Sequence, residues 1–116
     1  MTPPVIVDKR HCVEHRPFPG VRMFTTEGQW MTLSIVEMDP GAVIPEHAHP
    51  HEQVGYLVEG EFDFTIGGDT YHLVPGQMWR IPGGVPHKVV AGSQPVRALD
   101  VFYPIREDMR TPRQGA

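Results

Sequence analysis

Apolar and polar residues alternate along several short stretches of the chain, which is the pattern of strands with one buried face. Residues 62–66 read Phe-Asp-Phe-Thr-Ile, and residues 31–35 read Met-Thr-Leu-Ser-Ile. We expect both stretches to be half-buried strands whose apolar side chains face the core. The other predicted strands are 70–74, which a Gly-Gly-Asp turn at 67–69 joins to 62–66 as a hairpin, and 85–91 and 96–103.

Glycine and proline divide the chain into these short stretches. The 116 residues include 13 prolines and 12 glycines, and both residue types disfavour helices by about 1 to 3 kcal/mol each. Turn-forming pairs recur about every 8 to 12 residues, the spacing of strands in a sandwich or barrel. We therefore predict an all-β fold and a single domain over residues 1–116, with its barrel core at about 20–106. The first dozen residues and the tail from about Asp108 show no clear period, so we expect loosely ordered ends.

Charge and composition argue against several kinds of partner. The net charge is −4, and no run of Lys or Arg with interleaved aromatic residues is present, so nucleic acid is not an expected partner. No stretch approaches the ~18 apolar residues of a membrane span, and the first residues lack the basic and apolar regions of a signal peptide. Cys12 is the single cysteine, which excludes an internal disulfide. We expect a cytoplasmic protein that does not bind membranes.

A cluster of nitrogen and oxygen donors is the strongest chemical signal. Residues 47–53 read His-Ala-His-Pro-His-Glu-Gln, and a Pro-His pair follows at 86–87. His47 and His49 are two residues apart, so on extended chain both rings point to one side. Pro50 makes a single strand doubtful, but a strand, a bend and a second strand would still let these side chains converge. Imidazole and amide oxygen suit divalent first-row ions, and we predict one mononuclear site, without a choice among Ni, Zn, Fe, Mn and Co, with the ligands His47, His49, Gln53 and His87.

Alternatives to this ligand set stay open. Gln53 could instead hydrogen-bond neighbouring strands while the three histidines bind the ion without it. The turn at Pro50 is expected to lead His51 outward. The histidines that have no motif around them, and that we expect at the surface, are His11, His15 and His72.

Two spaced motifs resemble those of the cupin superfamily. Gln53 stands where the first motif usually has Glu, and Ala91 stands where the second usually ends in Asn. The resemblance implies a double-stranded β-helix, a small jelly-roll barrel. The motifs are Gly41-x5-His47-x-His49-x3-Gln53-x6-Gly60 and Gly76-x5-Pro82-x-Gly84-x2-His87.

A narrower resemblance covers roughly residues 30–108. Residues 47–56 and 100–108 are similar to the small cupins of pectin and alginate breakdown that linearise 4,5-unsaturated monouronates. In that family the metal is held by two His, a Gln and a later His. The matching ligands here are His47, His49, Gln53 and His87, and the residues matching those implicated in catalysis are Asp100, Phe102 and Arg106.

Asp100 is the first of these candidates. In residues 96–102 the alternation places it on the same face as Val96, Ala98 and Phe102, where a carboxylate is costly to bury unless it is paired or functional. Its functional role would be to move a proton as general base or acid. The alternative is an ion pair, with the candidate partners Arg97 and Arg80.

Arg106 shares the parity of this strand beyond Pro104, and a guanidinium can hold a carboxylate through a bidentate fork. We interpret it as a clamp for a uronate, against the alternative of a solvated arginine. Phe102 would form a wall of the pocket and part of the core. The other aromatic or large residues that could line the pocket, although core packing is commoner, are Tyr56, Trp79 and Met78.

Together these features predict a metal-dependent cupin that converts a small unsaturated cyclic uronate, an anionic substrate, to its linear keto form. The alternatives are a metal-dependent cupin dioxygenase and a non-enzymatic cupin that binds or senses a small ligand. We also expect a homodimer, because an open barrel edge favours pairing. The apolar residues expected to supply its contact area are Trp30, Met38 and Tyr103.

Overall fold

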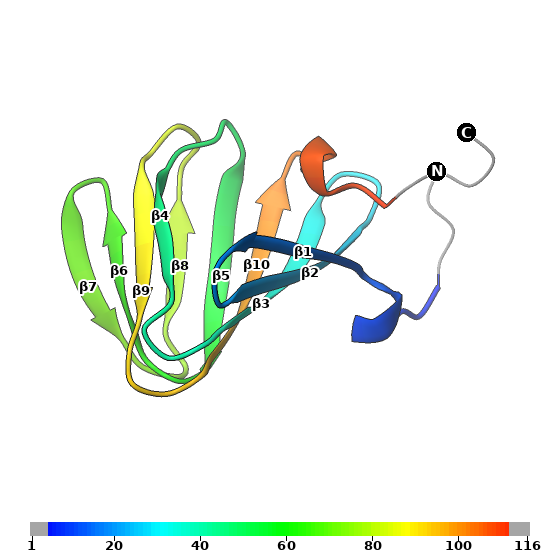
Figure 1. Ribbon diagram of the computed structural model, residues 1–116. Helices are drawn as coiled ribbons and strands as arrows, with labels where there is room; N and C mark the ends of the chain where they lie inside the picture. The colour runs from blue at the N-terminus through cyan, green and yellow to red at the C-terminus, as the bar shows by residue number, and fades with distance from the viewer. Residues whose placement is uncertain (1–4, 112–116) are drawn as a thin grey trace.

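The computed structural model describes residues 5–111, and within that range every long element is a strand (Figure 1). Two antiparallel sheets lie against each other, one with strand order β1-β2-β3-β10-β5-β8 and the other with order β4-β9-β6-β7. The all-β jelly roll expected from the sequence is therefore confirmed. The strands are β1 (Val13–Phe18), β2 (Val21–Glu27), β3 (Thr32–Met38), β4 (Val43–His47), β5 (Glu52–Glu59), β6 (Phe62–Ile66), β7 (Asp69–Leu73), β8 (Met78–Ile81), β9 (His87–Ala91) and β10 (Val96–Tyr103).

Most of the predicted strands are present with the predicted faces. In β6, Phe62 and Phe64 are buried and Asp63 is exposed, as the alternation requires. The turn between β6 and β7 has two consecutive glycines with positive φ, 58° at Gly67 and 94° at Gly68, a conformation that glycine adopts without a Cβ clash. This hairpin was correctly predicted.

The predicted face of β3 is wrong. Its inner side chains include Thr32 and Ser34, while Leu33 is 43% exposed on the outer face. The residues that continue the inner face, Val36 and Met38, are apolar and belong to the core. The polar half of this face lies against the cavity at Ser34 and against the residues beyond β10 at Thr32, whose hydroxyl accepts from the backbone N–H of Arg106. Local alternation could not reveal that polar residues occupy the inside here.

The segment after β10 is ordered where the sequence shows no period. Residues Glu107–Met109 form a 3-10 turn, η2, just beyond the tip of β10 (Figure 1). The backbone N–H of Arg106 donates to Thr32 Oγ1 at 2.9 Å, and Thr25 Oγ1 donates to the carbonyl of Met109 at 3.1 Å. Side-chain hydroxyls of β2 and β3 thus bind this segment to the large sheet. We call residues 104–111 the C-terminal segment below.

The N-terminal part also departs from the loose order expected for it. Residues Lys9–His11 form a 3-10 turn, η1, capped by the Asp8 side chain. Lys9 Nζ contacts Glu37 Oε2 on β3 at 3.0 Å, and the strands begin at Val13, before the predicted start of the core. The remaining parts of the predicted loose ends, residues 1–4 and 112–116, lie outside the described residues. No helix among residues 5–111 is long and apolar enough to cross a membrane.

The hydrophobic core lies between the two sheets and forms part of the cavity wall next to the histidines. Leu57 and Phe64 come from opposite sheets and are almost completely buried in it, as is Met38 at 1% exposure. Burying side chains of this size stabilises the fold by about 1.5 to 3 kcal/mol each. The predicted role of Met38 in a dimer contact is therefore wrong, because this side chain is enclosed by its own barrel.

The outer face of the six-stranded sheet carries an apolar surface. The strand register places Leu33, Val101 and Val54 side by side across β3, β10 and β5. A neighbouring row follows the same three strands into β8, with the members Ile35, Leu99, Tyr56 and Met78. Contiguous apolar surface of this kind on a sheet commonly marks an interface. We expect this face to be the contact between two copies of the chain, with the exposed Trp30 and Tyr103 available as further contacts.

Val54→Lys places a charge in the centre of that face and should convert a dimer to a monomer, because the ammonium would lose its hydration in the contact. Light scattering at micromolar concentration measures the mass. Tyr71→Lys, at an exposed apolar position on the other sheet, is the control and should leave the mass unchanged. A monomer mass for the unaltered chain would contradict the prediction.

Candidate functional site

Three histidines converge at one end of the barrel. His47 is the last residue of β4 and lies opposite His87, the first residue of β9, while His49 follows in the loop between β4 and β5. One ring nitrogen of each can be chosen so that all three lie within 4.8 Å of one another. The predicted arrangement of a strand, a bend and a second strand brings His49 and Gln53 to the same place. Three imidazoles at this separation are arranged as a metal site.

Hydrogen bonds fix the free nitrogen of each ring. In all three, Nδ1 contacts a backbone carbonyl and therefore carries the proton, which leaves the Nε2 lone pair available for an ion. Nε2 of His87 is buried without a hydrogen-bond partner among residues 5–111. The Nδ1 contacts are His47 to Pro45 at 2.9 Å, His49 to His51 at 3.1 Å and His87 to Val85 at 2.9 Å.

Burial favours the neutral, metal-binding form of two of the three histidines, His49 and His87. Burial lowers the pKa of His87 to about 4, despite its bond to a carbonyl. Burial also lowers the pKa of His49, and the nearby Arg106 guanidinium acts in the same direction. Neutral imidazoles with aligned Nε2 lone pairs fit a divalent first-row ion.

Gln53 connects this cluster to a buried carboxylate. Its Oε1 lies 3.1 Å from Nε2 of His49, and its Nε2 donates to Oδ1 of Asp100 at 2.9 Å. The amide oxygen therefore points to the histidines, where it could serve as a fourth ligand, and the amide nitrogen points to β10. From the sequence, Gln53 was expected to be either a metal ligand or a hydrogen-bond partner between strands. The observed orientation of its amide is compatible with both roles.

Asp100 is buried on the inner face of β10, as the alternation predicted. Its Oδ1 accepts from Gln53 and also from Nε1 of Trp79, at 2.8 Å. Burial raises the pKa of Asp100 to about 6, although both hydrogen bonds and Arg106 oppose the shift. A carboxyl group with a pKa in this range can both accept and return a proton near neutral pH.

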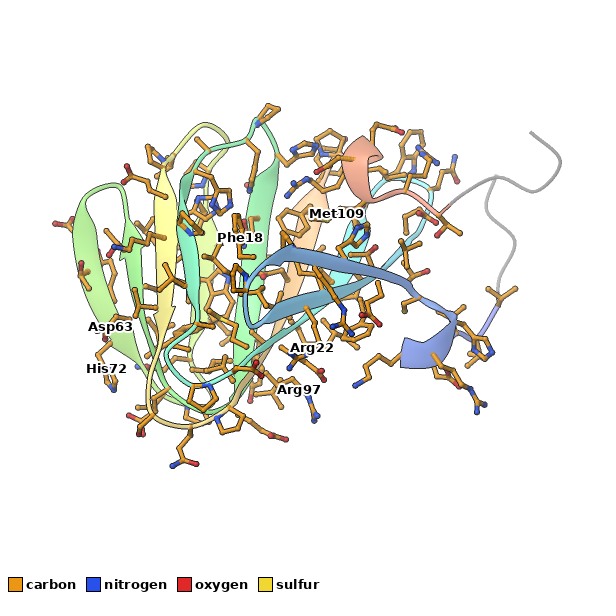
Figure 2. All side chains as sticks on the ribbon, viewed as in Figure 1. Phe18, Arg22, Asp63, His72, Arg97 and Met109 are labelled. Carbon is orange, nitrogen blue, oxygen red and sulfur yellow. The ribbon has the colours of Figure 1, made fainter. Side chains whose placement is uncertain are left out.

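The alternative ion pair of Asp100 with Arg97 or Arg80 is wrong, because Oδ1 is bonded to uncharged donors. Arg97 lies near Arg22 at the foot of the large sheet (Figure 2) and contacts Glu37 at 3.5 Å. Arg80 alternates to the opposite, exposed face of β8 from the buried Trp79.

Gly55 makes the contact between Trp79 and Asp100 possible. The register places Gly55 opposite Asp100 on one side and opposite Trp79 on the other. A Cβ at this glycine would lie 2.2 Å from Nε1 of the indole, so the ring passes directly over the glycine backbone to reach the carboxylate. Sequence alone gave no role to Gly55, because the requirement comes from a neighbouring strand.

Arg106 and Phe102 flank the same space. The Arg106 guanidinium carbon lies 4.8 Å from the centroid of the Phe102 ring, and that ring packs against His49 with centroids 5.5 Å apart. Arg106 also forms a two-point ion pair with Asp108, with Nη2 2.8 Å from Oδ2. Its side chain is only 13% exposed, so it is not the solvated arginine of the alternative interpretation.

A cavity of about 270 Å³ joins these groups. Asp100, Phe102 and Arg106 line it together with His47 and His87. The rest of the wall is largely apolar and comes in part from β1 and the C-terminal segment; Figure 2 marks two of its residues. These two are Phe18 and Met109.

Ser34 is a polar wall residue that the sequence did not single out. Its side-chain Oγ is buried without a hydrogen-bond partner among the described residues, and the register places it opposite Asp100. Its hydroxyl, in the cavity wall, can both donate and accept a hydrogen bond. The misassigned face of β3 concealed it. Of the three other residues considered as pocket lining, Trp79 does line the cavity, while Tyr56 and Met78 are exposed on the outer face.

The remaining histidines are only partly where the sequence placed them. His11 is exposed, and His72 is exposed between Asp63 and Glu61 on the small sheet (Figure 2). His15 is instead half-buried, because its Nε2 lies 3.1 Å from Thr25 Oγ1. His51 is also half-buried, since the loop turns its ring to within 5.5 Å of the His49 ring.

The cupin-domain family matches residues 34–102, and the chain belongs to this family. The fold is similar to the structure of KdgF from Halomonas sp., with a TM-score of 0.82, 29% sequence identity and coverage of 93% of this chain and 99% of that one.

Two curated relatives are much longer than the matched region. The quercetin 2,3-dioxygenase of Bacillus subtilis is 29% identical over 73 residues, which are 62% of this chain and 22% of that protein. The transcriptional regulator PuuR of Escherichia coli, of the helix-turn-helix type, is 45% identical over 49 residues, 41% of this chain and 26% of that protein. The matches thus span about a quarter of these relatives.

Metal analysis of protein purified without a chelating tag should give close to one equivalent of a divalent first-row ion. His87→Ala removes the buried Nε2 donor and should weaken binding by more than the about 10- to 100-fold caused by loss of an outer partner. His72→Ala, at an exposed histidine away from the cluster, is the control. Equal metal content in His87→Ala and the unaltered protein would show that His87 is not a ligand.

Gly55→Ala should displace the Trp79 indole and break its bond to Asp100, because the new methyl group overlaps the ring. Overpacking of this kind destabilises by about 1 to 3 kcal/mol. Thermal unfolding and near-ultraviolet circular dichroism report the two effects. Gly28→Ala is the matched control, since a Cβ there meets nothing within 4 Å. Equal unfolding temperatures for the two variants would contradict the assignment.

The raised pKa of Asp100 predicts a pH dependence of stability. Between its ordinary value of 3.8 and about 6, the folded chain holds this proton more tightly than the unfolded chain, so stability falls as pH rises. Relative to Asp100→Asn, the metal-free protein should lose up to about 3 kcal/mol across this interval. Urea unfolding at several pH values measures the free energy of unfolding of both proteins. His87 is present in both, so its own pH-dependent contribution cancels in the difference between them. A difference independent of pH would contradict the shift.

Proposed function

We propose that this cupin is a metal-dependent enzyme that converts a small unsaturated cyclic uronate to its linear keto form. The observation that carries the proposal is one cavity lined by a carboxyl group, Asp100, a half-buried guanidinium, Arg106, and two of the three clustered histidines, His47 and His87. The resemblance of residues 47–56 and 100–108 to uronate-linearising cupins supports the substrate class. The similarity to KdgF over nearly the whole chain supports it further.

Arg106 would bind the carboxylate that distinguishes a uronate from a neutral sugar. Its planar N–H donors match two carboxylate oxygens, and its low exposure strengthens that contact relative to one in open solvent. Phe102 lies beneath the guanidinium and excludes water from one side of the site. A substrate held in this way has its ring within the apolar part of the cavity.

Asp100 would carry the proton that the reaction moves. Opening the ring requires removal of the proton of the hemiacetal hydroxyl, cleavage of the bond between that carbon and the ring oxygen, and return of a proton to the carbon at the end of the enol double bond. A single carboxylate can accept the first proton and deliver the second. The hydrogen bonds from Gln53 and Trp79 both end on Oδ1 of Asp100, so Oδ2 would be the oxygen that exchanges the proton.

The donor set suits an anionic substrate. When bound, a divalent ion supplies Lewis acidity that stabilises negative charge developing on a substrate oxygen. Imidazole and amide ligands carry no charge of their own, so a set of His47, His49, His87 and Gln53 would leave the full charge of such an ion to act on the substrate.

A second candidate is a metal-dependent dioxygenase, which the similarity to quercetin 2,3-dioxygenase favours. A third is a ligand sensor, which the similarity to part of the PuuR regulator favours. The three candidate functions differ in whether oxygen is consumed and whether a product is formed. An oxygenase uses dissolved oxygen during turnover, a sensor binds its ligand without forming product, and the linearising enzyme does neither.

The deciding experiment is incubation of the metal-loaded protein with 4,5-unsaturated galacturonate under anaerobic conditions. We expect loss of the ultraviolet absorbance of the conjugated double bond at a rate proportional to enzyme concentration. The same reaction in air, followed with an oxygen electrode, should consume no oxygen. An unchanged absorbance with fully metal-loaded protein would overturn the proposal.

Asp100→Asn keeps the shape of the side chain but removes its proton-accepting oxygen. It should reduce kcat by about 10² to 10⁴ with little change in KM or metal content. Arg106→Lys keeps the charge but loses the planar fork, so its defect should fall mainly on kcat/KM. Steady-state kinetics and metal analysis separate the two defects. A normal rate for Asp100→Asn would leave Asp100 a structural role only.

A further inference from the structure

The guanidinium of Arg106 is held along one of its edges by Asp108. Nε lies 3.0 Å from Oδ1 and Nη2 lies 2.8 Å from Oδ2, which is a parallel two-point contact. A guanidinium has five N–H groups, and this contact uses two of them on the Nε side. The N–H groups of Nη1 and the second N–H of Nη2 therefore form a second pair of parallel donors, which we call the second fork.

Two further contacts fix the same residue. The Phe102 ring lies 4.8 Å beneath the guanidinium carbon, which sets the plane of the group. The backbone N–H of Arg106 donates to Thr32 Oγ1, which sets the position of its Cα relative to β3. Arg106 and Asp108 both line the cavity, but the side chain of Arg106 is 13% exposed, whereas that of Asp108 is 60% exposed. Asp108 thus holds Arg106 from the solvent-exposed rim of the cavity.

We propose that Asp108 is a positioning residue that aims the second fork of Arg106 at the carboxylate of the ligand. The inference rests on the proposed function for the statement that the ligand carries a carboxylate. An arginine side chain has several rotatable bonds, and a fixed plane with one edge anchored removes most of that freedom before a ligand arrives. The preference for a uronate over a neutral sugar would then depend on Asp108 through its contact with Arg106.

The neighbouring residue Glu107 supplies a matched control. It forms the same kind of two-point contact with Arg110, at 2.7 and 2.8 Å, and neither residue lines the cavity. Glu107→Gln therefore removes one negative charge from η2 without altering the support of Arg106. Any effect on ligand binding that arises only from the net charge of this segment should appear equally in Glu107→Gln and Asp108→Asn.

The test uses two probes, D-galacturonate and D-galactose, titrated calorimetrically into the metal-loaded full chain. Asp108→Asn should weaken galacturonate binding by about 5- to 20-fold, leave galactose binding within about 2-fold, and leave metal content and unfolding temperature unchanged. Glu107→Gln should match the unaltered protein with both probes. Asp108→Glu, which keeps the charge, should recover part of the galacturonate affinity.

A double-mutant cycle distinguishes a positioning role of Asp108, which acts through Arg106, from a merely structural role, which does not. In the Arg106→Lys background no second fork exists, so adding Asp108→Asn should have little further effect on galacturonate. Tighter galacturonate binding by Asp108→Asn would show that Asp108 competes with the ligand for Arg106, and it would overturn the proposal. Equal binding by the two proteins, or an additive cycle, would overturn it as well.

Turnover of 4,5-unsaturated galacturonate separates this inference from the function on which it rests. If the unaltered protein does not turn over this compound, while Asp108→Asn selectively loses galacturonate affinity, the enzymatic proposal fails and the positioning role stands. If the unaltered protein is active, while Asp108→Asn binds galacturonate normally and keeps an unchanged KM, the positioning role fails and the function stands.

Discussion

The burial of the Asp100 carboxylate is the constraint on which the site depends. A buried carboxylate needs donors, and the two present are the amide of Gln53 and the indole of Trp79. The Gln53 amide can donate to Asp100 and still present an oxygen to His49, which a carboxylate at the same position could not do. The neutral residue in the histidine motif is thereby explained by its neighbour on β10.

Much of the site could be predicted from the sequence because its determinants are local. The convergence of His47, His49 and Gln53 follows from spacing, and the inward direction of Asp100 follows from alternation along one strand. The same reasoning failed for β3, where Thr32 faces inward to bond Arg106, 74 residues later. The role of Gly55 was also out of reach, since it depends on an indole crossing from β8.

Electrostatics around the cavity follow from desolvation more than from charge pairing. Burial is the largest effect on both His87 and Asp100, and it favours the uncharged form of each. The other charged groups of the lining, Arg106 and Asp108, form an ion pair with each other at the edge of the cavity. In such an environment any charge carried by a bound ion or ligand is weakly screened and acts strongly on its neighbours.

The cavity wall is built from two sources that differ in how freely they can change. The histidines, Gln53 and Asp100 lie on or between paired strands, where an insertion would shift a register and turn inner side chains outward. Asp108 and Met109 instead lie beyond the last strand, in a segment attached through a few hydroxyl groups. During evolution, substitutions or changes of length there could reshape ligand preference while the barrel and its histidine cluster are preserved. One barrel of this design can give rise to relatives that recognise different small molecules.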